Sequence, residues 1–173
     1  MSGAVLTLVA LGLAAAPPAS RPVGRADVAA LEKRFDQRLT SYAVDDPIEL
    51  LGNTRGVYID GYGVVFSTEV SLAPAPALTP FRPSIPRDQV NRVRDKKLTR
   101  LPALKKLMIE LMASSAATLR DLPPQEQIVF GVTLHYWSWE DTNGLPAQIV
   151  MQAPRKSLID RAPVESAVRV REF

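Results

Sequence analysis

The sequence predicts an α+β fold, in which an antiparallel sheet built from two β-hairpins has an N-terminal helix and a long central helix packed on one face. Hydrophobic residues recur at helical spacing in two segments, 27–40 and 101–120. They alternate with other residues at strand spacing around turn signals in two further segments, at about 56–72 and 127–153. The length of 173 residues, 46% of them hydrophobic, suits one domain, which we place at 21–165.

The first twenty residues, MSGAVLTLVALGLAAAPPAS, have the pattern of a signal peptide. The apolar run from Ala4 to Ala16 has 13 residues, within the roughly seven to fifteen of a signal-peptide core and short of the roughly twenty that span a membrane. The segment has no Lys or Arg, which departs from the usual pattern. An uncleaved anchor and a buried N-terminal helix or strand are the alternatives. We therefore expect export to the periplasm or the medium, with no transmembrane span once the leader is removed.

The first helix is expected over residues 27–40. Asp27 is placed to cap it, because a side-chain oxygen at that position can accept a bond from the free backbone donors of the first turn. The sequence Asp45-Asp46-Pro47 ends the helical pattern. Its apolar stripe consists of Val28, Leu31, Phe35 and Leu39.

The stretch RGVYIDGYGVVFSTEV, residues 55–70, contains Gly61-Tyr62-Gly63 and raises the question of a phosphate-binding loop. The glycines of a dinucleotide-binding loop open a helix, whereas a β-branched and aromatic run follows them here. Asp60-Gly61 is a strong hairpin signal, since glycine accepts the positive φ that such turns require. We therefore predict two strands joined by a tight turn, not a phosphate site.

Five prolines between Ala73 and Pro86 predict an extended loop, because proline lacks a backbone donor and fixes φ. A polar helical segment follows over 87–100. Pro102 then marks a break or a new first turn, and a helix with an apolar face is expected from Leu101 to Arg120.

The second hairpin begins with residues 127–139, which alternate in the manner of a strand. Asn143-Gly144 supplies a turn, and 147–153 supply the returning strand. A short helix is expected at 155–161, and residues 166–173 are interpreted as a tail that can form a frayed strand.

The element order of helix, hairpin, long helix and hairpin resembles that of roadblock/longin and profilin-like proteins. The resemblance rests on the order of elements, and no motif accompanies it, so no function is transferred with it. It implies one alternative: a cytosolic dimeric scaffold in which residues 1–20 are a structural segment.

The composition excludes several chemistries. There is no cysteine, so disulfides, thiolate metal sites and cysteine nucleophiles are ruled out. There is one histidine, which excludes histidine-rich metal sites. We accordingly expect no metal and no cofactor. The formal charge of +3 gives a mild preference for anionic partners.

Glu69, His135 and Glu140 are the candidate groups for a second interpretation, a small exported hydrolase. Hydrolysis of a glycosidic bond needs two carboxylates about 5 to 9 Å apart. Glu69 and Glu140 would meet only if the two hairpins pair in a particular register. The simpler interpretation of His135 is a half-exposed residue on a strand.

Both tryptophans, Trp137 and Trp139, follow Tyr136 and are expected on one face of the same strand. Aromatic rings exposed on a flat strand suit stacking on sugar rings or contact with a protein. The simpler interpretation is that a helix covers them. With His135 they form the first candidate contact surface.

The second candidate surface is the segment 87–106, with eight Lys and Arg against two Asp, a net charge of +6. A basic helix suits an anionic envelope component or an acidic protein partner, and a solvated helix face is the simpler interpretation. Export and the lack of interleaved aromatic residues argue against nucleic acid. The candidate contact residues in this segment are Arg92, Arg94, Lys96, Lys97 and Arg100.

The preferred interpretation is therefore a small exported binding module that carries out no reaction. Its ligand is not defined by the sequence, and self-association into a homodimer is a further expectation. The hydrolase and the cytosolic scaffold are the alternatives.

Overall fold

The computed structural model describes residues 23–42, 48–76, 78–81, 83–160 and 163–173. The predicted signal peptide, residues 1–20, lies outside the described residues, as does the helix-ending sequence at 45–47.

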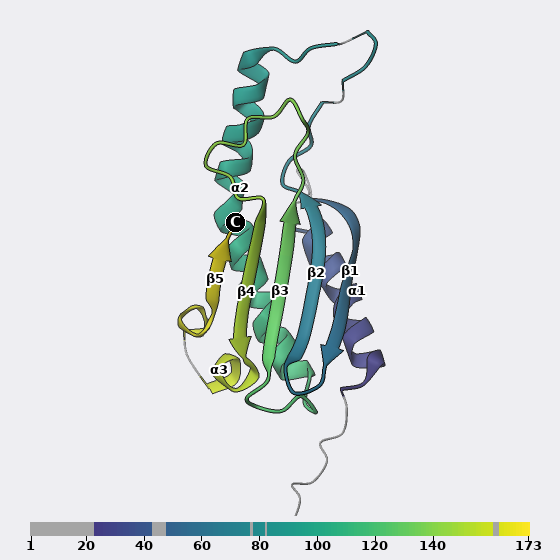
Figure 1. The fold of residues 1–173 in the computed structure, drawn as a ribbon, viewed down its shortest axis with the longest axis vertical. Coiled ribbons are helices and arrows are strands. Elements are labelled where there is room, and N and C mark those ends of the chain that lie inside the picture. Colours follow the sequence, from purple (N-terminus) through teal and green to yellow (C-terminus); the bar gives the residue numbers. More distant parts are fainter. Residues whose placement is uncertain (1–22, 43–47, 77, 82, 161–162) are drawn as a thin grey trace, which may run out of the picture.

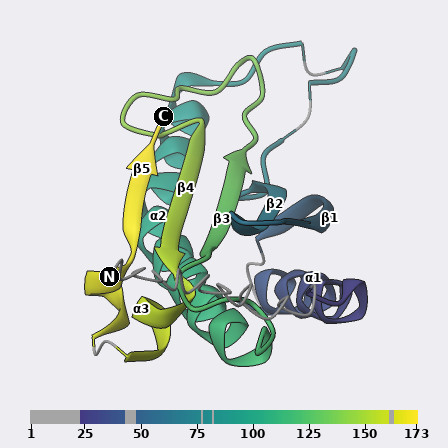
Figure 2. The ribbon, with the colours of Figure 1, turned by 60° about the horizontal axis from the view of Figure 1, so that its bottom comes forward.

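The α+β class is confirmed, and Figure 1 shows the strands as one layer with α1 and α2 behind it. Figure 2, seen from another side, places both helices on the same face of that layer. The elements in chain order are α1 (Arg25–Thr40), β1 (Glu49–Ile59), β2 (Gly63–Ser71), α2 (Arg87–Thr118), β3 (Gln127–Leu134), β4 (Gln148–Pro154), α3 (Arg155–Asp160), the 3-10 helix η1 (Val164–Ala167) and β5 (Arg169–Glu172).

The sheet is mixed, in contrast to the antiparallel sheet expected from two hairpins. Its strand order is β1-β2-β3-β4-β5. The pairs β1–β2 and β3–β4 are antiparallel, while β2 and β3 pair in parallel. A parallel pair needs a crossover of a dozen residues or more, and the 32 residues of α2 provide it.

The turn between β1 and β2 is a tight hairpin turn, as predicted. The Tyr62 N–H donates to the Ile59 carbonyl at 3.0 Å, and Gly61 takes a φ of +73°. The glycines therefore serve the chain reversal and open no helix.

Of the two interpretations of residues 166–173, a tail or a frayed strand, the structure has a strand in the last part, because β5 pairs with β4 in an antiparallel ladder. The Phe173 N–H donates to the Gln148 carbonyl at 3.0 Å. Val170 lies opposite Met151 in this ladder. The short strand thus forms one edge of the sheet.

The expected break at Pro102 does not occur, since α2 is continuous from Arg87 to Thr118. A proline inside a helix removes one backbone hydrogen bond. Buried side chains on both sides of it, Leu101 and Leu104, anchor the helix against the sheet. Tertiary packing therefore outweighs the local preference. A smaller correction concerns α1, which starts after Gly24 and not at an Asp27 cap.

The core lies between the sheet and the two longer helices. Phe35 of α1 contacts Phe66 of β2 and Phe130 of β3, with ring centroids 4.7 and 4.9 Å apart. The inward face of β3 consists of Ile128, Phe130, Val132 and Leu134, which are all buried. The described helices leave the opposite face of the sheet uncovered (Figure 1).

Candidate functional site on the uncovered sheet face

The segment that follows β3 differs from the predicted strand. β3 ends at Leu134, and the Glu140 N–H donates to the Trp137 carbonyl at 3.0 Å to close a turn. Trp137 and Trp139 therefore do not share a strand face. The Trp137 side chain is 47% exposed. Trp139 is half-buried, and its indole N–H has no hydrogen-bond partner among the described residues.

His135, Glu69 and Trp137 come together at the end of β3. His135 Nδ1 lies 3.5 Å from Glu69 Oε1, and the imidazole and indole rings meet edge to face with centroids 5.2 Å apart. The His135 N–H also donates to the Val70 carbonyl at 2.9 Å, which holds its backbone beside β2. Three of the residues singled out in the sequence thus form one cluster.

Next to this cluster the uncovered face has a shallow hollow of about 300 Å³. It lies between β1, β2 and β3. Side chains with hydrogen-bonding groups line it, among them Asn53, Arg55, Ser67, Glu69 and Thr133. The hollow can therefore hold a polar group, and the His135–Trp137 pair stands at one side of it.

A row of paired residues crosses the uncovered face through this hollow. The register places Arg55, Ser67, Gly131, Val150 and Arg171 side by side on β1 to β5. Two of the central residues, Ser67 and Gly131, are small, and the two arginines stand on the edge strands with exposed side chains. The row therefore has a cation at each end, on the two edge strands of the sheet.

Sequence reasoning missed Arg55, Ser67, Thr133 and Arg171. Arg55 began the glycine-containing stretch, and Arg171 lay in the segment interpreted as a tail. Nothing local in the sequence marks them, because the β2–β3 pairing and the β4–β5 pairing join residues far apart in the chain.

Glu140 does not join Glu69, which corrects the carboxylate pair of the hydrolase interpretation. Its Oε2 lies 2.6 Å from Lys97 Nζ, and both side chains are only 1% exposed. Its Oε1 accepts the Trp137 N–H at 3.2 Å. Only Glu69 and His135 of the three proposed catalytic groups therefore meet.

Tyr136 completes a buried cluster with Lys97 and Glu140 beneath the same loop. Lys97 Nζ lies 4.7 Å from the centre of the Tyr136 ring and donates to the His135 carbonyl at 3.2 Å. The Tyr136 hydroxyl donates to the Pro146 carbonyl at 2.8 Å. Burial, and secondarily the nearby Glu140 charge, raise the pKa of Tyr136 to about 12. The cluster fixes the loop that carries Trp137.

The basic segment is not the single contact face that the sequence suggested. Lys97 is buried, Arg92 pairs with Asp88, and Arg94 Nη1 pairs with Asp141 at 2.9 Å. The guanidinium of Arg100 donates to the Leu72 carbonyl. The backbone N–H of Asn143 and the Arg94 side chain lower the pKa of Asp141. Of the five candidates, Arg92 and Lys96 keep exposed side chains.

A signal for the burial of Lys97 was present in the sequence. Val93, Lys97 and Leu101 are spaced by four residues, so they share one stripe of the helix. A cation inside an apolar stripe indicates a buried partner, because an unpaired buried charge is strongly unfavourable.

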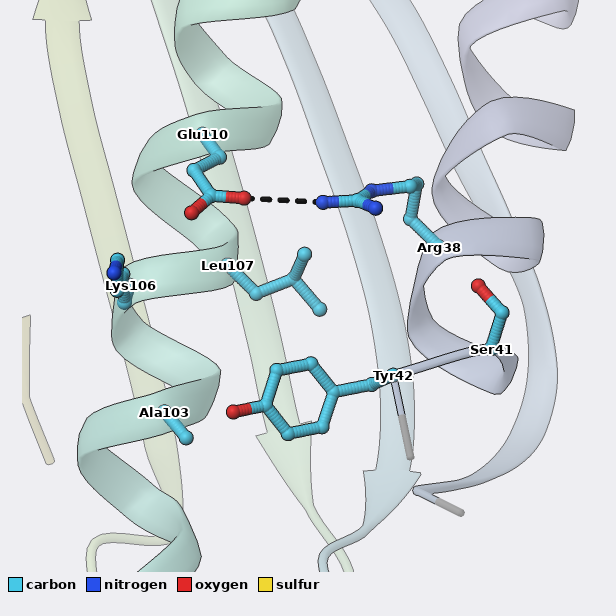
Figure 3. A pocket seen from close by; sticks show the side chains of 7 residues that line it. All are labelled: Arg38, Ser41, Tyr42, Ala103, Lys106, Leu107 and Glu110. Carbon is cyan, nitrogen blue, oxygen red and sulfur yellow. Dashed lines mark hydrogen bonds and ion pairs between the residues drawn. The ribbon is translucent and has the colours of Figure 1, made fainter. Parts of the chain in front are cut away.

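A second hollow, of about 290 Å³, lies between α1 and α2 on the helical side. Figure 3 shows Leu107 on its floor and the Tyr42 ring at one end, with its hydroxyl toward α2. The Arg38 guanidinium bridges it and donates to Glu110 Oε2 at 3.1 Å (Figure 3). Because this pair satisfies both charges, the hollow offers a ligand less than the uncovered sheet face does.

No family model, curated protein or solved structure matches the chain. In the part of the chain that the structure describes, no helix is long and apolar enough to cross a membrane. The same described residues contain no cluster of three or more His, Asp or Glu placed to hold a metal ion.

Proposed function

We propose that the protein is an exported, non-catalytic binding module that takes an anionic polysaccharide of the cell envelope across the uncovered face of its sheet. The observation that carries this proposal is the row from Arg55 to Arg171, with a cation at each end and the small residues Ser67 and Gly131 between them. A chain lying along the row meets Ser67 and Gly131, whose small size lets it approach the backbone.

The dimensions of the row suit an extended polymer. Adjacent strands are about 4.8 Å apart, so the two edge strands are separated by roughly 19 Å. That separation exceeds one sugar unit, so the two arginines would bind acidic groups on different units. Guanidinium groups are well suited to carboxylates and phosphates, which they can bind through two parallel hydrogen bonds.

Trp137 supports a sugar ligand at one side of the row. Its ring is half-exposed and held by the contact with His135. An aromatic ring of this kind stacks on the apolar face of a sugar, while Glu69 and Thr133 offer hydrogen bonds to hydroxyl groups.

A hydrolase finds less support. Glu69 and His135 are the two candidate groups that lie together, and they stand at a shallow hollow open to solvent. Glu140 is occupied by Lys97. An active site usually encloses its substrate to exclude water. The open geometry of this hollow therefore favours ligand binding over hydrolysis.

The proposal is tested by measuring binding to polygalacturonate, a defined anionic polysaccharide, against dextran as the neutral control. The expected result is binding to polygalacturonate that weakens with salt. Arg55→Gln and Arg171→Gln should each reduce affinity several-fold, and Trp137→Ala by roughly tenfold. Arg120→Gln, on the exposed end of the helical layer, is the matched control.

Equal binding to dextran, or no loss in the two arginine variants, would contradict the assignment of the row. Isolated peptidoglycan is the second probe. Its retention of the native chain but not of the double variant Arg55→Gln/Arg171→Gln would identify wall glycan as a ligand within this class.

Export is tested separately, by intact mass of the protein in fractions of cells that express it with residues 1–20. A mass lacking about 15 to 20 residues outside the cytoplasm agrees with a cleaved signal peptide. A full-length chain in the cytoplasm would instead favour the dimeric scaffold.

A further inference from the structure

The loop between β2 and α2 carries an aromatic side chain in open solvent. Phe81 is 99% exposed, the highest value among the large hydrophobic residues that the structure describes, and Leu78 nearby is 46% exposed. Figures 1 and 2 both show this loop projecting well beyond the end of the sheet. Contact of so much apolar surface with water is unfavourable. Phe81 and Leu78, which we call the loop tip, would therefore be more stable in an apolar environment.

The composition of the loop limits the conformations that its backbone can adopt. Residues 73–86 contain five prolines and no Asp or Glu. Proline restricts the backbone, which lowers the conformational entropy that ordering on a partner would remove. The loop tip can therefore enter an apolar partner with little further ordering of the loop.

Cations lie where the loop joins α2. Arg87, the first residue of that helix, has an exposed side chain and no ion-pair partner within the described part of the chain. Arg92 and Lys96 line a hollow of about 230 Å³ that also contacts Pro74 and Pro76 of the loop. Asp88 pairs with Arg92 and offsets one of these charges. The local balance remains positive.

We propose that this end of the molecule is a peripheral membrane site, in which Phe81 and Leu78 enter an anionic bilayer surface and Arg87 and Arg92 meet its phosphate headgroups. Exposed apolar residues on a loop that joins α2 at its cations fit the boundary between acyl chains and headgroups, where both kinds of contact are available. A protein pocket for Phe81 would bury the ring but would give no role to the exposed cation of Arg87 at the start of α2. This membrane site is separate from the polysaccharide site proposed on the uncovered face of the sheet.

The test is cosedimentation of the full chain with vesicles of phosphatidylglycerol and phosphatidylcholine, compared with phosphatidylcholine alone. We expect binding to the anionic vesicles that falls with added salt. Phe81→Ser should weaken it roughly tenfold, the effect of losing one buried aromatic side chain. Phe173→Ser is the matched control, since Phe173 is also exposed, at 65%, but lies on the edge of the sheet.

Arg87→Gln should reduce binding to anionic vesicles by roughly fivefold and leave binding to phosphatidylcholine unchanged. Residues 1–20 contain no charged side chain, so any contribution from them is similar on the two compositions and on all variants. Equal binding of Phe81→Ser and Phe173→Ser, or no preference for the anionic vesicles, would overturn the proposal and favour a protein pocket as the target of the tip. Binding of Phe81→Ser to polygalacturonate should be unchanged, which separates this site from the sheet face.

Discussion

Glu32 of α1 accepts the backbone N–H of Gly56 in β1 at 2.7 Å, so a helix side chain satisfies a donor of the edge strand. One turn later, Asp36 accepts the Thr54 N–H at 2.8 Å. An uncovered edge strand is a template for pairing with another chain. The two carboxylates therefore close part of the β1 edge, and the uncovered face is the free surface of this half of the sheet.

Glu32→Ala is expected to lower the free energy of unfolding by about 1–3 kcal/mol, because it leaves the Gly56 N–H without its partner. Urea denaturation measures the change. Lys33→Ala, at an exposed neighbouring position on α1, is the control and should alter stability by less than about 0.5 kcal/mol. Equal effects of the two substitutions would show that the edge contact adds nothing.

Acid should weaken the same contact. The hydrogen bond from Arg25, opposed by burial and assisted by the Gly56 N–H, lowers the pKa of Glu32. A carboxylate whose folded pKa is lowered contributes stability above its unfolded pKa, near 4.5, and this stability is lost as the pH falls through the folded value. The acid limb of the stability curve should therefore be shallower in Glu32→Ala, measured by urea denaturation across that pH range.

Much of the fold follows from local patterns. The helical stripe of Val28, Leu31, Phe35 and Leu39 is buried in α1, and all four belong to the core. The hairpin turn at Gly61 also follows from local chemistry, because a positive φ is needed there. Such features depend only on residues that are close in the sequence, so local patterns are enough to predict them.

The candidate site depends on pairings that local patterns do not specify. Arg55 and Arg171 belong to one row only because β2 pairs with β3 and β5 with β4. The sequence suggested His135, Glu69 and Trp137 separately, and their contact requires β2 to run parallel to β3. Trp139 and Glu140 were misplaced because the strand ends at Leu134, five residues before the predicted end.

Lys97→Met should lower the stability of the fold far more than the position of Lys97 in a basic helix suggests. It would leave Glu140 as an uncompensated buried charge, at a cost of about 3–5 kcal/mol. The double variant Lys97→Met/Glu140→Gln should recover part of this loss, because neither side chain is then charged. Thermal or urea unfolding measures both.

The control for Lys97 is the half-exposed pair of Arg38 and Glu110, in which Arg38→Met should cost about 0–1 kcal/mol. A Lys97→Met protein as stable as the Arg38→Met protein would mean that Glu140 finds another partner or water. The loop carrying Trp137 would then not depend on the buried pair.

Alkaline solution should reveal the burial of Tyr136. Its folded pKa is raised to about 12, above the ordinary value of 10. A group with a raised folded pKa contributes stability that is complete below its unfolded pKa and is lost as the pH rises through the folded value. Stability should thus fall between about pH 10 and 12, measured by urea denaturation alongside tyrosinate absorbance. Tyr136→Phe should reduce this fall, and an undiminished fall in that variant would assign it to other groups.

Gly63 offers a test of the parallel pairing itself. Gly63 is the first residue of β2 and lies opposite Gln127 of β3. A Cβ at Gly63 would lie 1.9 Å from the Gln127 carbonyl oxygen. The backbone φ of +138° is a second obstacle to any side chain. Gly63→Ala should therefore destabilise the protein by roughly 3–5 kcal/mol, because β2 and β3 must separate or shift. Gly52→Ala is the control, since a Cβ at Gly52 meets nothing within 4 Å. If urea denaturation found Gly63→Ala as stable as Gly52→Ala, β2 and β3 could not approach as closely at Gln127 as the register requires. The row on which the proposed site depends would then be in doubt.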